Sequence, residues 1–229
     1  MSVKFYKSEN QVPLEMHKVR VVQKLNLLPV DERLRAIQKA GNNTFLLQNK
    51  DIYLDMLTDS GVNAMSDRQT AAMHLADDAY AGSETFNRLK AAMKEVFGTD
   101  NVLPAHQGRA CENILAERFV KPGTVAIMNF HFTTTKAHVT RCGGEVVEVL
   151  HKKGLIPQSD DPFKGDMDLQ ELRRVITTYG PEKVAYVRVE AGTNLIGGQP
   201  VSLENMLAVA DICHEFGVPS ILDASLLQD

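Results

Sequence analysis

The sequence predicts an α/β fold, in which helices cover both faces of a mostly parallel sheet and an N-terminal arm precedes it. Two observations lead to this prediction. Short apolar runs rich in β-branched residues alternate with amphipathic segments, and strand–helix–strand alternation is typical of parallel sheets. The 229 residues also suffice to bury a sizeable core. The predicted strands cover residues 124–130, 144–150, 183–190 and 219–225.

The first 60 residues are expected to form the arm and the start of a small-domain or interface region. A helix is predicted over residues 30–41, because Pro29 precedes it and Gly41 ends it. The alternating pattern over residues 51–57 predicts a short strand. Residues 61–229 are expected to belong to a large domain.

A strong helix is predicted over residues 83–98, where Ser83 can cap the start and Gly98 ends the last turn. Residues 101–104 resemble the end of a short strand. The next helix follows from Ala110 to Phe119, because its apolar residues have helical spacing.

Two further helices are predicted between the later strands, over residues 168–180 and 202–217. The second is expected to bury one apolar face, which consists of Leu203, Met206, Leu207, Ala210 and Cys213.

Composition excludes several classes of protein. The chain is 44% hydrophobic and 24% charged, with a net charge of −4, and it has no basic stripe for nucleic acid or an anionic membrane. No apolar run is long enough to span a bilayer, and the N-terminus is too polar for a signal peptide. Three cysteines without metal-like spacing are interpreted as reduced thiols. We therefore expect a cytoplasmic protein.

Gln107, Gly108 and Arg109 stand where an extended segment changes into a helix. A helix N-terminus has unpaired N–H groups and partial positive charge, Gly108 allows close approach, and Arg109 adds a permanent cation. This arrangement predicts a phosphate site. The alternative is an ordinary helix start with a surface arginine.

Asp223 lies at the end of an apolar strand, so its carboxylate needs a cation or several donors. It is interpreted as the partner of a protonated pyridine nitrogen, or alternatively as a cap for the next turn. With the phosphate site this suggests pyridoxal phosphate. Phe132 could then cover the ring, or be a core residue. Asn194 could contact the phenolic oxygen, or form an Asx-turn.

Nine stretches between about residues 43 and 225 resemble the β-eliminating lyases, the family of tryptophanase and tyrosine phenol-lyase, in the family's order. They read NTFLL, LTDSG, AMSDRQ, DDAYAGSETF, PAHQGRACEN, FHFTTT, FKGDMDL, NLIGGQPVS and LDAS. The resemblance implies the fold-type I, aspartate aminotransferase-like superfamily of pyridoxal-phosphate enzymes. Residues 61–229 would be the N-terminal part of its cofactor-binding large domain.

The resemblance also implies roles for individual residues. The cofactor-binding set would be Gln107, Gly108, Arg109, Phe132, Asn194, Asp223 and Ser225. Tyr80 would protonate the leaving group in a neighbouring subunit's site, and Thr133 would be a second catalytic residue, at a position where tryptophanase has aspartate. Thr58 and Ser60 would bind the amino-acid end of the substrate, and Gly61 and Asp78 a K⁺ ion.

The chain departs from the family pattern in several places. Leu226 replaces the family's arginine, Thr70 replaces a phenol-lyase tryptophan, and Asp78 stands where a potassium-site glutamate is expected. The lysine that would bind the cofactor covalently lies beyond Asp229 in the family. We therefore expect half of a split, cleaved or truncated enzyme. It would be inactive alone, need a complementary C-terminal chain or segment, and belong to a homo-oligomer that is a tetramer in the resembled family.

The expected function is β-elimination from an amino acid, which yields pyruvate, ammonia and a leaving group. Two alternatives stay open. One is another fold-type I enzyme, such as an aminotransferase or an aldolase-like lyase, because the cofactor site is shared. The other is a non-catalytic half-chain, which the absent lysine favours.

Overall fold

The computed structural model describes residues 25–55 and 65–227. The chain divides into two compact units, Met1–Arg88 and Leu89–Asp229, and each is described by itself. The domain boundary predicted near residue 60 falls outside the described residues and stays a prediction.

The first unit contains α1 (Val30–Lys39), η1 (Thr44–Leu46), η2 (Asn49–Asp51) and α2 (Asp67–His74). The helix predicted at α1 is confirmed. The strand predicted from residue 51 is wrong over its described part, because residues 52–55 form neither helix nor strand. The alternating pattern has no neighbouring strand to pair with among the described residues, and Tyr53 and Leu54 are exposed.

Helix α3 (Glu84–Phe97) is confirmed and runs across the boundary between the units. The Ser83 hydroxyl accepts from the Phe86 N–H at 3.1 Å, and Gly98 ends the helix with φ = 73°. The strand predicted over residues 101–104 is wrong, since residues 98–107 contain neither helix nor strand. Pro104 has no N–H to donate to a sheet.

The second unit is built on a four-stranded sheet, which was predicted to be mostly parallel and has only parallel pairings. Its strands are β1 (Val125–Met128), β2 (Glu145–Glu148), β3 (Val184–Glu190) and β4 (Ser220–Asp223), in the order β2-β1-β3-β4.

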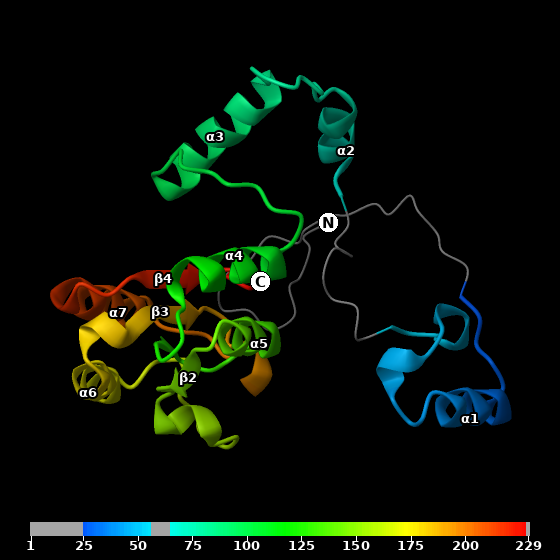
Figure 1. Ribbon diagram of the computed structural model, residues 1–229. Coiled ribbons are helices and arrows are strands. Elements are labelled where there is room, and N and C mark those ends of the chain that lie inside the picture. Colours follow the sequence, from blue (N-terminus) through cyan, green and yellow to red (C-terminus); the bar gives the residue numbers. More distant parts are fainter. Residues whose placement is uncertain (1–24, 56–64, 228–229) are drawn as a thin grey trace, which may run out of the picture. The chain divides into compact units, whose positions relative to one another are not determined.

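Four helices of this unit accompany the sheet, in green to red in Figure 1: α4 (Gly108–Phe119), α5 (Thr133–Arg141), α6 (Leu169–Tyr179) and α7 (Leu203–Phe216). Short turns η3 (Lys152–Leu155), η4 (Pro181–Lys183) and η5 (Asn194–Ile196) connect them. Ile127 and Val187 pack with Ile176 of α6 and Ile212 of α7 in one core. A second core joins Met128 and Tyr186 to α4 and α5 through Ala116 and Val139. Helices therefore cover both faces of the sheet.

The buried face of α7 differs in part from the predicted one: Cys213 is buried and Met206 packs against the core, as predicted, but Ala210 is exposed. Leu203 and Leu207 are 64% and 58% exposed, whereas Val209 and Ile212 are buried beside Cys213. Apolar residues occur on both sides of this helix, so helical spacing alone did not identify the side that meets the sheet.

Within the described ranges, no helix has the length and apolar character needed to cross a membrane.

Candidate functional site

The carboxyl ends of β1 and β3 are tied together by Asn129, which follows β1 and is fully buried. Its side-chain amide donates to the carbonyls of Gly165 and Glu190 at 3.0 Å and to the Thr193 hydroxyl at 3.1 Å. Its Oδ1 accepts the Glu190 N–H at 3.1 Å. The sheet edge from which the site residues project is therefore held by a satisfied, buried amide.

Helices α4 and α5 begin side by side. Glu112, in the first turns of α4, accepts hydrogen bonds from Thr134 at 2.5 Å and from Thr135, both in the first turn of α5. The N-cap residues Gln107 and Phe132 make no side-chain cap hydrogen bond. Two helix N-termini therefore present N–H groups and partial positive charge at neighbouring points.

Gly108 and Arg109, two of the three predicted phosphate-binding residues, are accessible at the start of α4. A Cβ added at Gly108 would meet nothing within 4 Å, so a ligand can approach the backbone there. Arg109 is exposed, and among the described residues its guanidinium has no hydrogen bond or ion pair. The start of α4 thus fits an anion such as a phosphate.

Asp223 is the last residue of β4, and its side chain is 19% exposed. Its Oδ1 accepts from the Ser225 N–H at 3.0 Å and from the Ser225 hydroxyl at 2.5 Å. Its Oδ2 accepts from Arg188 Nη2 at 2.6 Å. Asp223 therefore caps the following turn, which was the alternative interpretation of this residue. It also has a cationic partner, Arg188.

The sequence patterns did not single out Arg188 and Glu190 of β3 as site residues. Their exposed fractions are only 4% and 6%, and Arg188 Nη1 donates to Glu190 Oε2 at 3.2 Å. A signal was available, because two charged residues alternate with valines in the apolar run VRVE. Buried charges of this kind need partners, which here come from β3 itself and from β4.

The two carboxyl groups of this cluster differ in acidity. Burial raises the pKa of Asp223, but the hydrogen bonds from Ser225 and the charge of Arg188 outweigh burial and lower this pKa below its ordinary value. For Glu190, burial outweighs Arg188 and the Asn194 N–H, so its pKa is raised. The surroundings therefore favour the ionised form of Asp223, whereas burial disfavours the ionised form of Glu190.

Asp223 lies on the sheet face that α4 and α5 cover. Tyr186 and Ile221 pack in the core of that face, and Arg188 and Asp223 each lie two residues further along the same strands. Because side chains alternate along a strand, Arg188 and Asp223 point to this face as well. The helix starts and Asp223 therefore share one face and one edge of the sheet.

Phe132 and Asn194 lie at the same edge. Phe132 is the half-buried N-cap of α5 and belongs to neither core cluster. Asn194 begins η5, and its N–H donates to Glu190 Oε1 at 3.2 Å. Among the described residues its side-chain amide has no hydrogen bond, so the Asx-turn alternative is not observed. Thr133, the first residue of α5, is exposed.

Other predicted site residues belong to the first unit. Tyr80 and Asp78 are exposed, whereas Thr58, Ser60 and Gly61 lie outside the described residues. The neighbouring Asp77 accepts from the Thr85 N–H at 2.8 Å and the Thr85 hydroxyl at 2.7 Å, which lower the pKa of its carboxyl. Over the described ranges, no group of three or more metal-ligating side chains of His, Cys, Asp or Glu is present. The K⁺ site stays a prediction.

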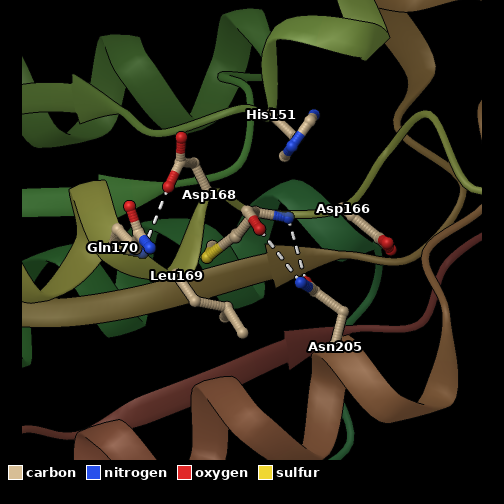
Figure 2. A pocket seen from close by; sticks show the side chains of 7 residues that line it. His151, Asp166, Asp168, Leu169, Gln170 and Asn205 are labelled. Atoms are coloured by element: carbon tan, nitrogen blue, oxygen red, sulfur yellow. Dashed lines mark hydrogen bonds between the residues drawn. The ribbon is translucent and has the colours of Figure 1, made fainter.

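Figure 2 shows a hollow elsewhere in the second unit, lined by His151, Asp166, Met167, Asp168, Leu169, Gln170 and Asn205. Its polar groups hold the fold together. Asn205 pairs with both backbone groups of Met167 at 2.9 Å, and Asp168 caps α6. None of the predicted site residues lines this hollow.

Residues 55–226 match the model of the β-eliminating lyase family. The chain belongs to this family of pyridoxal-phosphate enzymes, as the sequence motifs predicted.

Its relatives include tyrosine phenol-lyases. The chain is 44% identical to the enzyme of Nostoc punctiforme over 211 residues, which cover 92% of this chain and 45% of the relative. It is 41% identical to the enzyme of Fusobacterium nucleatum, over 93% of this chain and 46% of the relative. The chain thus spans about half the length of these relatives.

Solved structures are more distant. Cystalysin from Treponema denticola, whose structure contains pyridoxal 5′-phosphate, is 16% identical with a TM-score of 0.48, over 67% of this chain and 38% of that chain. An archaeal alanine:glyoxylate aminotransferase is 20% identical with a TM-score of 0.48, over 61% and 33% respectively.

Proposed function

We propose that the complete protein containing this chain is a pyridoxal-phosphate-dependent lyase that eliminates the β-substituent of an amino acid. The products are pyruvate, ammonia and the leaving group. One observation carries the proposal: two uncapped helix starts and an ionised aspartate share one face and one edge of a parallel sheet. Ligands of such sheets bind beyond the carboxyl ends of the strands.

The start of α4 holds the cofactor phosphate. The N–H groups of Gly108 and Arg109 are in the first turn, where the helix dipole favours an anion. The exposed Arg109 guanidinium can add charge-assisted hydrogen bonds, and Gln107 can donate its side-chain amide.

Phe132 would cover one face of the cofactor ring at the carboxyl edge of the sheet. Asp223 keeps the pyridine nitrogen protonated, because its carboxylate stays ionised beside it. Ser225 orients that carboxylate through two hydrogen bonds, and the unpaired Asn194 amide can reach the phenolic oxygen. When bound, the cofactor supplies an electron sink that acidifies the α-proton of an amino acid.

The remaining roles rest on family resemblance. Thr58 and Ser60 bind the amino-acid end of the substrate, and Thr133 and Tyr80 act near its β-substituent. Gly61 and Asp78 bind K⁺. The lysine that exchanges the α-proton is supplied by a C-terminal segment or chain, and the protein acts as a homo-oligomer.

Leu226 separates this protein from an ordinary tyrosine phenol-lyase. It is a half-buried apolar residue two positions after Ala224, where the family has a cation. A leucine cannot donate to the cofactor or to a phenolic leaving group. Thr133 nevertheless favours the phenol-lyase side of the family, as do the relatives named above. We therefore propose a β-substituent that is smaller or less acidic than phenol.

Pyruvate release by the complete protein tests this proposal, with S-alkyl cysteines, serine, tyrosine and tryptophan as substrates. We expect pyruvate only with added pyridoxal phosphate, and best from an S-alkyl cysteine or serine. A large preference for tyrosine contradicts the Leu226 argument but leaves the lyase assignment intact. Cofactor-dependent turnover without pyruvate from any substrate contradicts the lyase assignment itself.

A further inference from the structure

Three charged side chains meet at the carboxyl ends of β3 and β4. The strands pair in parallel with Arg188 opposite Ile221 and Glu190 opposite Asp223. Arg188 lies between the two carboxylates, at 3.2 Å from Glu190 and 2.6 Å from Asp223. The side chains of Arg188, Glu190 and Asp223 are only 4%, 7% and 19% exposed.

The cluster of Arg188, Glu190 and Asp223 contains more acidic groups than basic ones. One guanidinium faces two carboxylates, which leaves one negative charge when both are ionised. A partly buried charge is costly unless something compensates it. Asp223 is the more exposed of the two carboxylates, so the uncompensated charge is accessible there.

We propose that Arg188 and Glu190 are positioning residues that set the charge and direction of Asp223 toward the ring nitrogen of the cofactor. This inference rests on the proposed function. Arg188 holds the Asp223 carboxylate through a hydrogen bond from its Nη2, while its Nη1 donates to the Glu190 carboxylate. Because Arg188 is shared, Asp223 keeps enough negative charge to hold a protonated nitrogen.

Glu190 has a second connection to the site. Its Oε1 accepts the N–H of Asn194, while its Oε2 faces Arg188. A glutamine at this position keeps an acceptor for Asn194 but no longer carries the charge that attracts Arg188. Arg188 would then pair with Asp223 alone and neutralise it.

The experiment measures cofactor affinity of the complete apo-protein by equilibrium dialysis with pyridoxal phosphate. Glu190→Gln removes the net negative charge, and we expect it to weaken binding about tenfold, the scale of one charge-assisted hydrogen bond. Arg188→Gln combined with Glu190→Gln restores a single net negative charge at Asp223. We expect this double variant to bind within about threefold of the parent, since Coulomb attraction follows the net charge.

The rescue separates charge balance from a structural role, because lost packing or hydrogen bonding would make the double variant worse than the single one. Unfolding midpoints of the apo-proteins show that each variant is folded. Glu215→Gln is the matched control, since it removes the carboxylate of an exposed Arg173–Glu215 pair at 2.8 Å. We expect its cofactor affinity to equal that of the parent.

Asp223→Asn distinguishes the two levels of the proposal. If it binds cofactor as tightly as the parent, the proposed ring-nitrogen contact is wrong. If Asp223→Asn weakens binding but Glu190→Gln does not, the proposed function stands and the inference about Arg188 and Glu190 is overturned. A double variant no tighter than Glu190→Gln overturns it too.

Discussion

Arg109 is expected to strengthen cofactor binding through its contact with the phosphate. Arg109→Ala in the complete protein should weaken pyridoxal-phosphate binding by about 1.5–3 kcal/mol, the range for a hydrogen bond to a charged group. Arg118→Ala is the control, because Arg118 lies in the last turn of the same helix and stacks on Phe119. Equal affinities of the parent and the Arg109 variant would show that the phosphate binds elsewhere.

Tyr186 gives a prediction about pH. It is buried beside Phe119, with ring centroids 6.4 Å apart, and burial raises its pKa from 10.0 to about 12. The folded state therefore favours the neutral phenol, and this contribution to stability is lost as pH rises from 10.0 toward about 12. Tyr186→Phe should flatten the fall of unfolding free energy over this pH window in denaturant titrations. An unchanged slope contradicts the assigned pKa.

The sequence identified Asp223 but missed its partner Arg188. An acid at the end of an apolar run is visible in the sequence, because it needs compensation wherever the run is buried. The contact with Arg188 depends on the register of β3 and β4, which places residues 35 positions apart within 2.6 Å. No local pattern specifies that register, so the charge cluster emerged only from the structure.

At the element scale, Glu112 holds α4 and α5 in their relative positions. Glu112→Gln should lower the unfolding free energy by about 1.5–3 kcal/mol, because Thr134 and Thr135 both donate to a charged carboxylate. It should also weaken cofactor binding, since the two helix starts would no longer be fixed. The control is Glu117→Gln, whose side chain forms a surface pair with Arg141 on the same helices. If both variants behave alike in urea titrations and dialysis, the hydrogen bonds of Thr134 and Thr135 to Glu112 have no special role.

Two alanine substitutions in α7 can show which face of this helix is buried. Ile212→Ala should destabilise the protein by about 2–4 kcal/mol, because Ile212 is 3% exposed and its removal leaves a cavity. Leu207→Ala should cost less than about 0.5 kcal/mol, because Leu207 is exposed. Chemical denaturation of both variants measures this difference, and the reverse order would support the face predicted from spacing.

Elements were predictable where pattern and boundaries agreed. The four sheet strands, α1, α3, α6 and α7 lie within the expected ranges, because the apolar spacing and the flanking cap or turn residues indicated the same bounds. Residues 52–55 and 101–104 carry strand-like patterns without a strand partner in the described part of the chain. A strand needs a neighbour as well as a pattern, and only tertiary structure shows the neighbour.

At the scale of the whole molecule, the proposed oligomer makes Tyr80 act in a neighbouring subunit's site. Tyr80→Phe and Asp223→Asn should each abolish most pyruvate release by the complete protein. Subunits of the two variants, unfolded together and refolded, should regain about a quarter of parental activity, because random pairing gives one native site in half of the dimers. No recovery in verified mixed oligomers would place Tyr80 in its own subunit's site or outside any site.

In the proposed binding mode, pyridoxal phosphate binds at the carboxyl edge of the sheet, between the start of α4 and Asp223. A crystal structure of the complete protein with the cofactor tests it most directly. We predict that the phosphate accepts hydrogen bonds from the N–H groups of Gly108 and Arg109, and that the ring nitrogen lies within hydrogen-bonding distance of Asp223. A phosphate bound away from α4, or a ring nitrogen that faces another residue, would contradict the account.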